Sequence, residues 1–80
     1  MNQNTLQRHQ ILEILYTVRE TNPKRGWLSD TKLKEALGGK DIEFALGVLT
    51  ELSYIKRDGY ELTITGGGVL ACEGGRTDVG

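Results

Sequence analysis

An Asp-Gly pair at positions 58 and 59 divides the segment YIKRDGYELT into two short runs with high β-strand propensity. Asp-Gly is a preferred two-residue hairpin loop, because a type I′ turn requires positive φ at both central residues. With this pair as the loop, the predicted strand partners are Arg57 with Tyr60, Lys56 with Glu61, Ile55 with Leu62, and Tyr54 with Thr63. Aliphatic side chains then share one face and a Lys-Glu pair lies on the other, so we expect a hairpin with one buried face.

The spacing of aliphatic residues predicts a helix ahead of this hairpin, near the start of the chain. Asn4 or Thr5 can serve as its N-cap, and it runs to about Glu20 before Pro23 stops it. Its inward face is predicted to consist of Ile11, Ile14, Leu15 and Val18. The following loop carries basic residues, and after it Trp27 and Leu28 form an apolar pair long enough for a strand fragment. We expect Trp27 to fill the core where the sheet meets the helices.

Two further helices are predicted between the strand fragment and the hairpin. Ser29 or Asp30 can cap the first, which the Gly38-Gly39 pair would end in a left-handed conformation. Its inward residues are predicted to be Leu33, Ala36 and Leu37. Asp41 can cap the second, which reaches about Ser53. Its buried stripe is predicted to be Ile42, Ala45, Leu46, Leu49 and Leu52.

The segment after the hairpin, ITGGGVLACEGG, has two interpretations. It can form a short helix that carries Val69, Leu70 and Cys72, although each glycine costs about 1 kcal/mol relative to alanine. It can also form a third hairpin strand after a glycine turn. We favour the helix, and we expect one domain over residues 1–73 followed by a flexible tail over 74–80.

Length and composition limit the class of protein. Eighty residues form one small domain, and 26 % charged with 38 % hydrophobic residues is typical of a globular chain. A single Cys cannot form an internal disulfide, and no apolar run approaches the roughly 18 residues of a membrane span. We therefore expect a cytoplasmic protein without a membrane partner. Net charge is −1 overall, but residues 19–40 carry +3 and residues 41–80 carry −4.

The order of helix, strand fragment, two helices and hairpin resembles the winged helix-turn-helix superfamily, loosely the bacterial regulators of the MarR and PadR type. The segment ALGGKDIEFALGVLTELSYIKRDG is similar to the family's second helix, turn, third helix and entry into the wing. Leu62, Thr63, Gly66 and Leu70 are similar to the residues that follow the wing and open a final helix. The resemblance implies an α+β fold of three main helices, a two- or three-stranded wing sheet and a short C-terminal helix.

The resemblance also implies a small transcription regulator that binds double-stranded DNA, as a possible homodimer, with the third helix in the major groove. Basic residues at which we expect contact with the DNA backbone are Lys24, Arg25, Lys32, Lys34, Lys40, Lys56 and Arg57. The outward face of the third helix departs from the family pattern, because it offers no Arg, Lys, Asn or Gln to reach base edges. That face is formed by Phe44, Gly47, Val48 and Glu51, although Phe44 can also pack beneath the hairpin or the C-terminal segment. The alternative prediction is therefore a protein-protein interaction module that uses this apolar and acidic face.

Other candidate residues point to no chemistry. His9 has no second His nearby and is expected to be exposed, while Cys72 is expected to be a small buried residue. The run Gly66-Gly67-Gly68 lacks the Lys and Ser or Thr of a phosphate-binding loop. We find no paired carboxylates, nucleophile-base set or metal cluster, and we expect no enzymatic activity, no cofactor and no metal.

Overall fold

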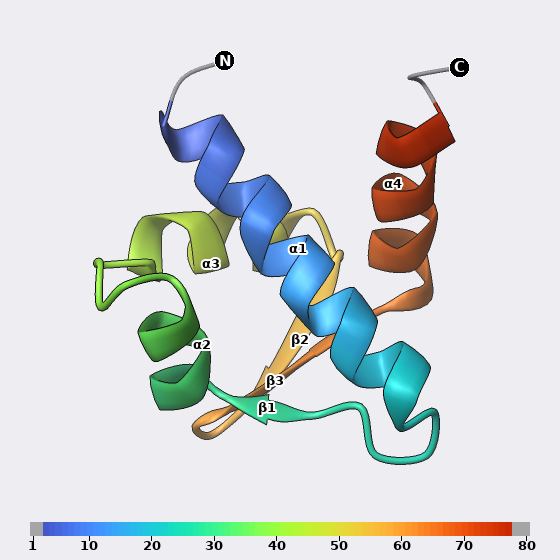
Figure 1. Cartoon of the computed structure of the whole chain (residues 1–80), viewed down its shortest axis with the longest axis horizontal. Coiled ribbons are helices and arrows are strands. Elements are labelled where there is room, and N and C mark those ends of the chain that lie inside the picture. Colours follow the sequence, from blue (N-terminus) through green and yellow to red (C-terminus); the bar gives the residue numbers. More distant parts are fainter. Residues whose placement is uncertain (1–2, 78–80) are drawn as a thin grey trace.

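The computed structural model describes residues 3–77 of the chain, with the side chains of residues 3–74. In this part the chain forms four helices and a three-stranded antiparallel sheet, a small α+β fold (Figure 1). The elements are α1 (Gln3–Thr21), β1 (Leu28–Ser29), α2 (Asp30–Ala36), α3 (Glu43–Glu51), β2 (Ile55–Asp58), β3 (Glu61–Ile64) and α4 (Gly66–Thr77). Figure 1 shows α1 lying across the sheet, with α2 and α3 on one side of it and α4 on the other.

The sheet has the strand order β1-β3-β2, so the hairpin supplies two strands and the fragment after α1 supplies the third. The predicted hairpin register is wrong by two residues. Asp58 pairs with Glu61 and Ile55 with Ile64, which makes Gly59 and Tyr60 the loop. Gly59 has φ +61°, whereas Tyr60 does not have positive φ, as expected for a type II′ turn with Gly at its first central position. A shift of two residues leaves every side chain on its predicted face.

Capping side chains and glycines determine where the short helices begin and end. Ser29 is the N-cap of α2, and its Oγ accepts a hydrogen bond from the backbone N–H of Lys32 at 3.2 Å. Gly38 and Gly39 end α2 with φ +81° and +77°, as predicted. Asp41 acts one residue earlier than a formal N-cap, because its Oδ1 accepts from the N–H of Glu43 at 3.0 Å.

The core lies between α1, the two short helices and one face of the sheet. Its buried aliphatic residues include Ile11, Leu12, Leu15, Leu33, Ile42, Ala45, Leu46, Leu49, Ile55, Leu62 and Ile64. Three predicted core residues are exposed instead, namely Ala36, Leu52 and Trp27. The first two stand where their helices end, and Trp27 precedes an inward Leu28 on an alternating strand.

The segment after the hairpin forms a helix, as predicted, and not the alternative third strand. Thr65 precedes α4, and its Oγ1 accepts from the N–H of Gly68 at 3.1 Å. Two side chains of α1 form hydrogen bonds at this end of the molecule. Arg19 donates to the carbonyl of Ile64 at 2.9 Å, and the Tyr16 hydroxyl donates to the carboxylate of Glu73 at 2.7 Å. Helix α4 continues to Thr77, beyond the predicted domain end at residue 73, and residues 78–80 lie outside the described part.

Candidate functional site

The outward face of α3 is set by the burial of its opposite face. Ala45, Leu46 and Leu49 are fully buried against the core, so the residues between them point to solvent. Phe44 is 65 % exposed, which excludes the possibility that it packs beneath the hairpin or α4. A Cβ added at Gly47 would meet no atom within 4 Å, so the surface one turn along from Phe44 is open. Val48 is half-buried beside them.

Carboxylates surround this apolar patch. Glu43 and Glu51 lie at the two ends of α3 and are exposed, and Asp41 stands just before the helix. No basic residue occurs anywhere in α3. The α3 face, defined as Phe44, Gly47, Val48 and Glu51, is therefore apolar at its centre and acidic at its rim.

Arg57 connects the hairpin to both short helices. Its guanidinium forms ion pairs with Asp30 at the start of α2, at 3.2 Å, and with Glu43 at the start of α3, at 3.3 Å. Its Nε also donates to the carbonyl of Gly59 at 3.3 Å. The Arg57 side chain is 35 % exposed, so each pair contributes at most about 1 kcal/mol. Two carboxylates thus balance the charge of one predicted DNA-binding residue, and sequence spacing could not reveal them.

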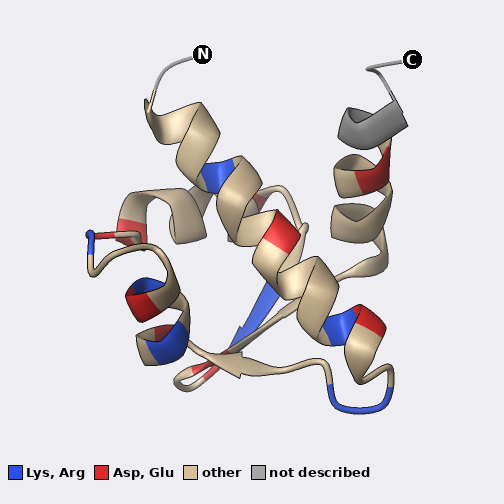
Figure 2. Cartoon of the chain, in the orientation of Figure 1, with Lys and Arg blue, Asp and Glu red and all other residues tan. Residues whose placement is uncertain are grey.

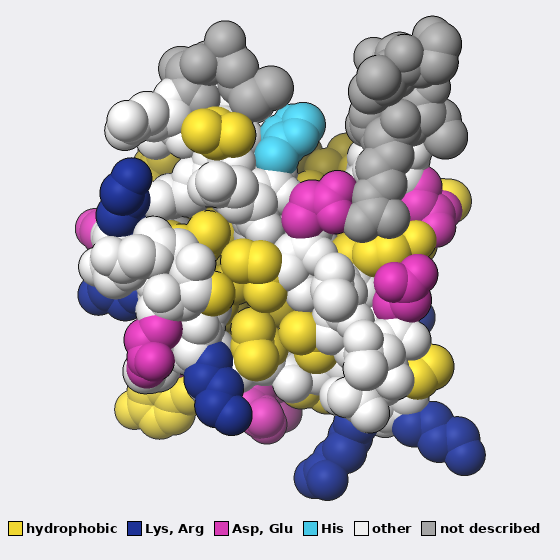
Figure 3. Space-filling view, in the orientation of Figure 1, with side chains coloured by type: hydrophobic (Ala, Val, Ile, Leu, Met, Phe, Trp, Pro, Cys, Tyr) yellow, Lys and Arg dark blue, Asp and Glu magenta, His cyan; other side chains and the backbone are white. Residues whose placement is uncertain are grey.

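The other six predicted cations are exposed, and the described residues give none of them an ion-pair partner. They do not form one surface. Lys32 and Lys34 belong to α2, Lys40 to the turn after it, and Lys56 to β2. The loop between α1 and β1, which carries Lys24 and Arg25, lies across the molecule from α2 (Figure 2). In Figure 3 the basic side chains of that loop project at the lower right, away from those at the left.

The charge of the short-helix and hairpin region is negative. Residues 30–64, which comprise α2, α3 and the hairpin, contain five basic and seven acidic residues, a net charge of −2. At the hairpin tip Asp58 and Glu61 stand opposite each other, both exposed. The surplus of positive charge counted along residues 19–40 depends on Arg19, Lys24 and Arg25, which lie outside this region.

A second candidate surface lies on the outer face of the sheet, where the sequence predicted a DNA contact for Lys56 but a core position for Trp27. Leu28 pairs with Leu62, which puts Trp27 level with Thr63, and Thr63 pairs with Lys56. The Trp27 residue is 38 % exposed. The missed signal was strand alternation, since an inward Leu28 requires an outward Trp27.

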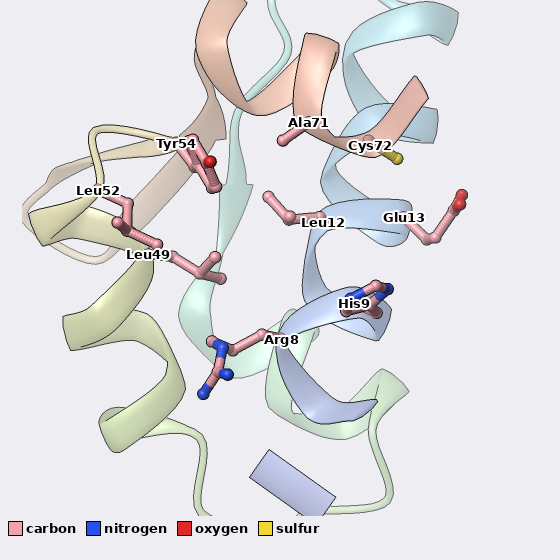
Figure 4. Close-up of a pocket in the computed structure, with 9 residues that line it drawn as sticks. All are labelled: Arg8, His9, Leu12, Glu13, Leu49, Leu52, Tyr54, Ala71 and Cys72. Carbon is pink, nitrogen blue, oxygen red and sulfur yellow. The ribbon is translucent and has the colours of Figure 1, made fainter. Parts of the chain in front are cut away.

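A cleft of about 250 Å³ opens between α1, the C-terminal end of α3 and α4 (Figure 4). Leu12, Leu49 and Tyr54 contribute to its walls, with Arg8 and His9 at one end and Cys72 at the other. His9 is exposed and Cys72 is buried, as predicted. The cleft is smaller than the roughly 300–1,000 Å³ of typical small-molecule sites.

Within residues 3–77, no cluster of three or more His, Cys, Asp or Glu side chains could hold a metal ion. No helix in the same range combines the length and the apolar character needed to cross a membrane. Comparison of the chain with protein-family models, with curated proteins and with solved structures gave no match.

Proposed function

We propose that this chain is a small winged-helix module that binds a partner protein through the α3 face. The order of elements and the β1-β3-β2 sheet are compatible with a winged-helix layout and support this proposal. The observation that carries it is the 65 % exposure of Phe44 beside an open Gly47. An exposed aromatic side chain beside a shallow notch is typical of a protein contact.

The charge around the patch favours protein over DNA as the partner of α3. A helix in the major groove is surrounded by phosphates, and Glu43 and Glu51 would both oppose its entry. The α3 face also lacks the Arg, Lys, Asn or Gln side chains that form most base contacts. We infer that the partner offers an apolar pocket for Phe44 with basic residues around it.

A second copy of the chain is a poor partner for the same face. A symmetric dimer places the same patch on both subunits, so Glu43 and Glu51 of one copy would approach those of the other. Like charges brought together in this way weaken association. The α3 face therefore fits a different protein better than it fits itself.

Affinity capture from cells that carry this gene tests the proposal. The full chain, a Phe44→Asp variant and a Tyr60→Asp control are used as baits, because Tyr60 is also highly exposed but lies at the hairpin tip. We expect at least one protein that is enriched by the parent and by Tyr60→Asp but lost with Phe44→Asp. Equal capture by all three baits, with the circular dichroism spectrum of Phe44→Asp unchanged, would reject the proposal.

Binding to the DNA backbone is a second candidate function, as the module of a transcription regulator. It is favoured by Lys32, Lys34 and Lys40, which are exposed on α2 and the adjoining turn without an ion-pair partner among the described residues. A single module makes few phosphate contacts, so useful affinity would require a homodimer. Duplex binding at low salt that is lost on reversal of these three charges would support it, and unchanged binding would exclude these residues.

A further inference from the structure

Two adjoining hollows lie on the outer face of the sheet, the face turned away from α1. One, of about 290 Å³, is lined by residues that include Arg19, Lys24, Trp27, Lys56 and Thr63. The other, of about 710 Å³, is lined by residues that include Trp27, Leu52, Lys56 and Thr65. Trp27 and Lys56 line both hollows, so the two form one continuous surface with the indole in the middle. We call this surface the Trp27 face.

Among the residues whose side chains the structure describes, the Trp27 face is free of acidic side chains, in a chain with more acidic than basic residues. No described Asp or Glu lines either hollow, whereas Arg19, Lys24, Lys56 and Arg57 do. Arg57 is balanced by its two carboxylates, and Arg19 donates to the carbonyl of Ile64. Among the described residues, Lys24 and Lys56 are therefore the two lysines of this surface available to an incoming anion; Lys24 lies in the loop before Trp27, and Lys56 lies on β2. Glu20 lies on the last turn of α1, and Glu61 with Asp58 forms the acidic row near the hairpin tip.

The backbone around Trp27 is held in place by hydrogen bonds. The Oγ1 of Thr63 donates to the carbonyl of Gly26, which ties the basic loop to the central strand. The Oγ1 of Thr65 donates in the same way to the carbonyl of Ser53 at the other side of the surface. A Cβ at Gly26 would stand 2.9 Å from Cα of Arg19, so the loop lies directly against α1. The indole and the two lysines are thus presented by a fixed framework.

We propose that the Trp27 face binds single-stranded nucleic acid. An exposed aromatic ring flanked by cations is the arrangement by which proteins bind single strands, with a base stacked on the ring and phosphates on the cations. The framework supplies one ring and two lysines, which matches a short, sequence-tolerant contact. A duplex fits poorly, because its bases are already stacked on each other and cannot reach the indole. The face is separate from α3, so this inference does not depend on the partner protein.

The chain contains one tryptophan, so its own fluorescence reports directly on this surface. A (dT)10 oligonucleotide added to the full chain at low salt is expected to quench Trp27 emission with a saturating isotherm. A duplex of equal length should bind more weakly. Saturating quenching by (dT)10 supports the proposal, and no change in emission overturns it.

Fluorescence anisotropy of labelled (dT)10 then measures the contribution of each residue. Trp27→Ala should weaken binding by roughly five- to 150-fold, and Trp27→Phe should restore part of the loss because it retains a ring. Lys24→Gln and Lys56→Gln should each reduce the slope of log affinity against log salt by about 0.7. Arg8→Gln removes one positive charge from α1 and serves as the control with little effect, because Arg8 lines neither hollow and belongs to no proposed binding surface.

Results that would overturn binding of single strands at the Trp27 face can be distinguished from failure of the proposed protein-binding function of the α3 face. Equal weakening by Arg8→Gln and by Lys24→Gln or Lys56→Gln would show diffuse attraction instead of a site. A shift in Trp27 emission with phosphatidylglycerol vesicles but not with (dT)10 would assign the face to an anionic membrane surface. Phe44→Asp should bind (dT)10 like the parent, so loss of the partner protein leaves this test intact.

Discussion

Replacement of Gly68 by alanine should destabilise the protein, because a new methyl group has no room there. A Cβ at this position would lie 2.1 Å from the carbonyl oxygen of Tyr54 and 2.6 Å from Cγ1 of Ile64. Neither neighbour can easily move. Ile64 is buried in the core, and the Tyr54 carbonyl accepts the N–H of Thr65 at 2.9 Å.

The expected size follows from two opposing effects. Overpacking in a close-packed region costs about 1–3 kcal/mol, and a clash with backbone belongs at the upper end of that range. Alanine in place of glycine in a helix returns up to about 1 kcal/mol. The net loss for Gly68→Ala should be about 2 kcal/mol, or roughly 10 °C in Tm for a domain of this size.

Gly67→Ala is the matched control, one residue earlier in the same helix. A Cβ there would have Thr65 Oγ1 as its nearest neighbour, at an ordinary contact distance of 3.7 Å. This variant should be as stable as the parent or up to about 1 kcal/mol more stable. Urea unfolding followed by circular dichroism at 222 nm measures both variants. If Gly68→Ala and Gly67→Ala unfold at the same urea concentration, the start of α4 does not pack against Tyr54 and Ile64.

Three further perturbations test the core, a helix cap and the Arg57 ion pairs. Leu46→Ala should lower the free energy of unfolding by about 2–5 kcal/mol, because Leu46 is buried in the core. Leu70 is 70 % exposed, so Leu70→Ala should change the free energy of unfolding by less than about 0.5 kcal/mol. Similar losses for both variants would contradict the assigned core. Ser29→Ala should lower the stability measured by thermal unfolding by about 1 kcal/mol, whereas Ser29→Asp should be about as stable as the parent, because Asp can also cap a helix. If Ser29→Ala is as stable as the parent, Ser29 does not cap α2. Arg57→Met should cost up to about 2 kcal/mol at low salt, because it removes two ion pairs worth at most about 1 kcal/mol each, and less at 0.5 M salt. A loss that does not depend on salt would indicate packing instead.

Much of the fold was predictable from local sequence patterns, and the errors in the prediction have local causes. Four of the five residues that aliphatic spacing predicted for the α3 stripe are buried, because a helix turns by a fixed angle per residue. In α1 it predicted buried Ile11 and Leu15 but missed buried Leu12, and Ile14 and Val18 are only half-buried. The pattern failed at Leu52, where α3 has already ended and Ser53 takes a φ of +61°. The hairpin register was wrong because Gly59 can serve at either central position of a two-residue turn, and sequence alone does not distinguish the two.

The candidate surfaces were harder to predict, since they depend on residues distant in sequence. Helical rotation placed Phe44 on the outward face of α3 but left open whether it packs beneath the hairpin or the C-terminal segment, and its exposure excludes that packing. The pairing of Arg57 with Asp30 and Glu43 did not, because these residues are separated by 27 and 14 positions. A count of charge along the chain likewise grouped Lys24 with Lys34, although their segments lie on different sides of the molecule.

Photo-crosslinking from position 44 tests most directly whether α3 is the surface that binds the partner. A photoreactive phenylalanine analogue at Phe44 is compared in cells with the same analogue at Tyr60, which is even more exposed and lies at the hairpin tip. We predict a discrete protein adduct from position 44 that is absent from position 60. Adducts to DNA from position 44, or the same protein adducts from both positions, would contradict a protein-binding role for the α3 face.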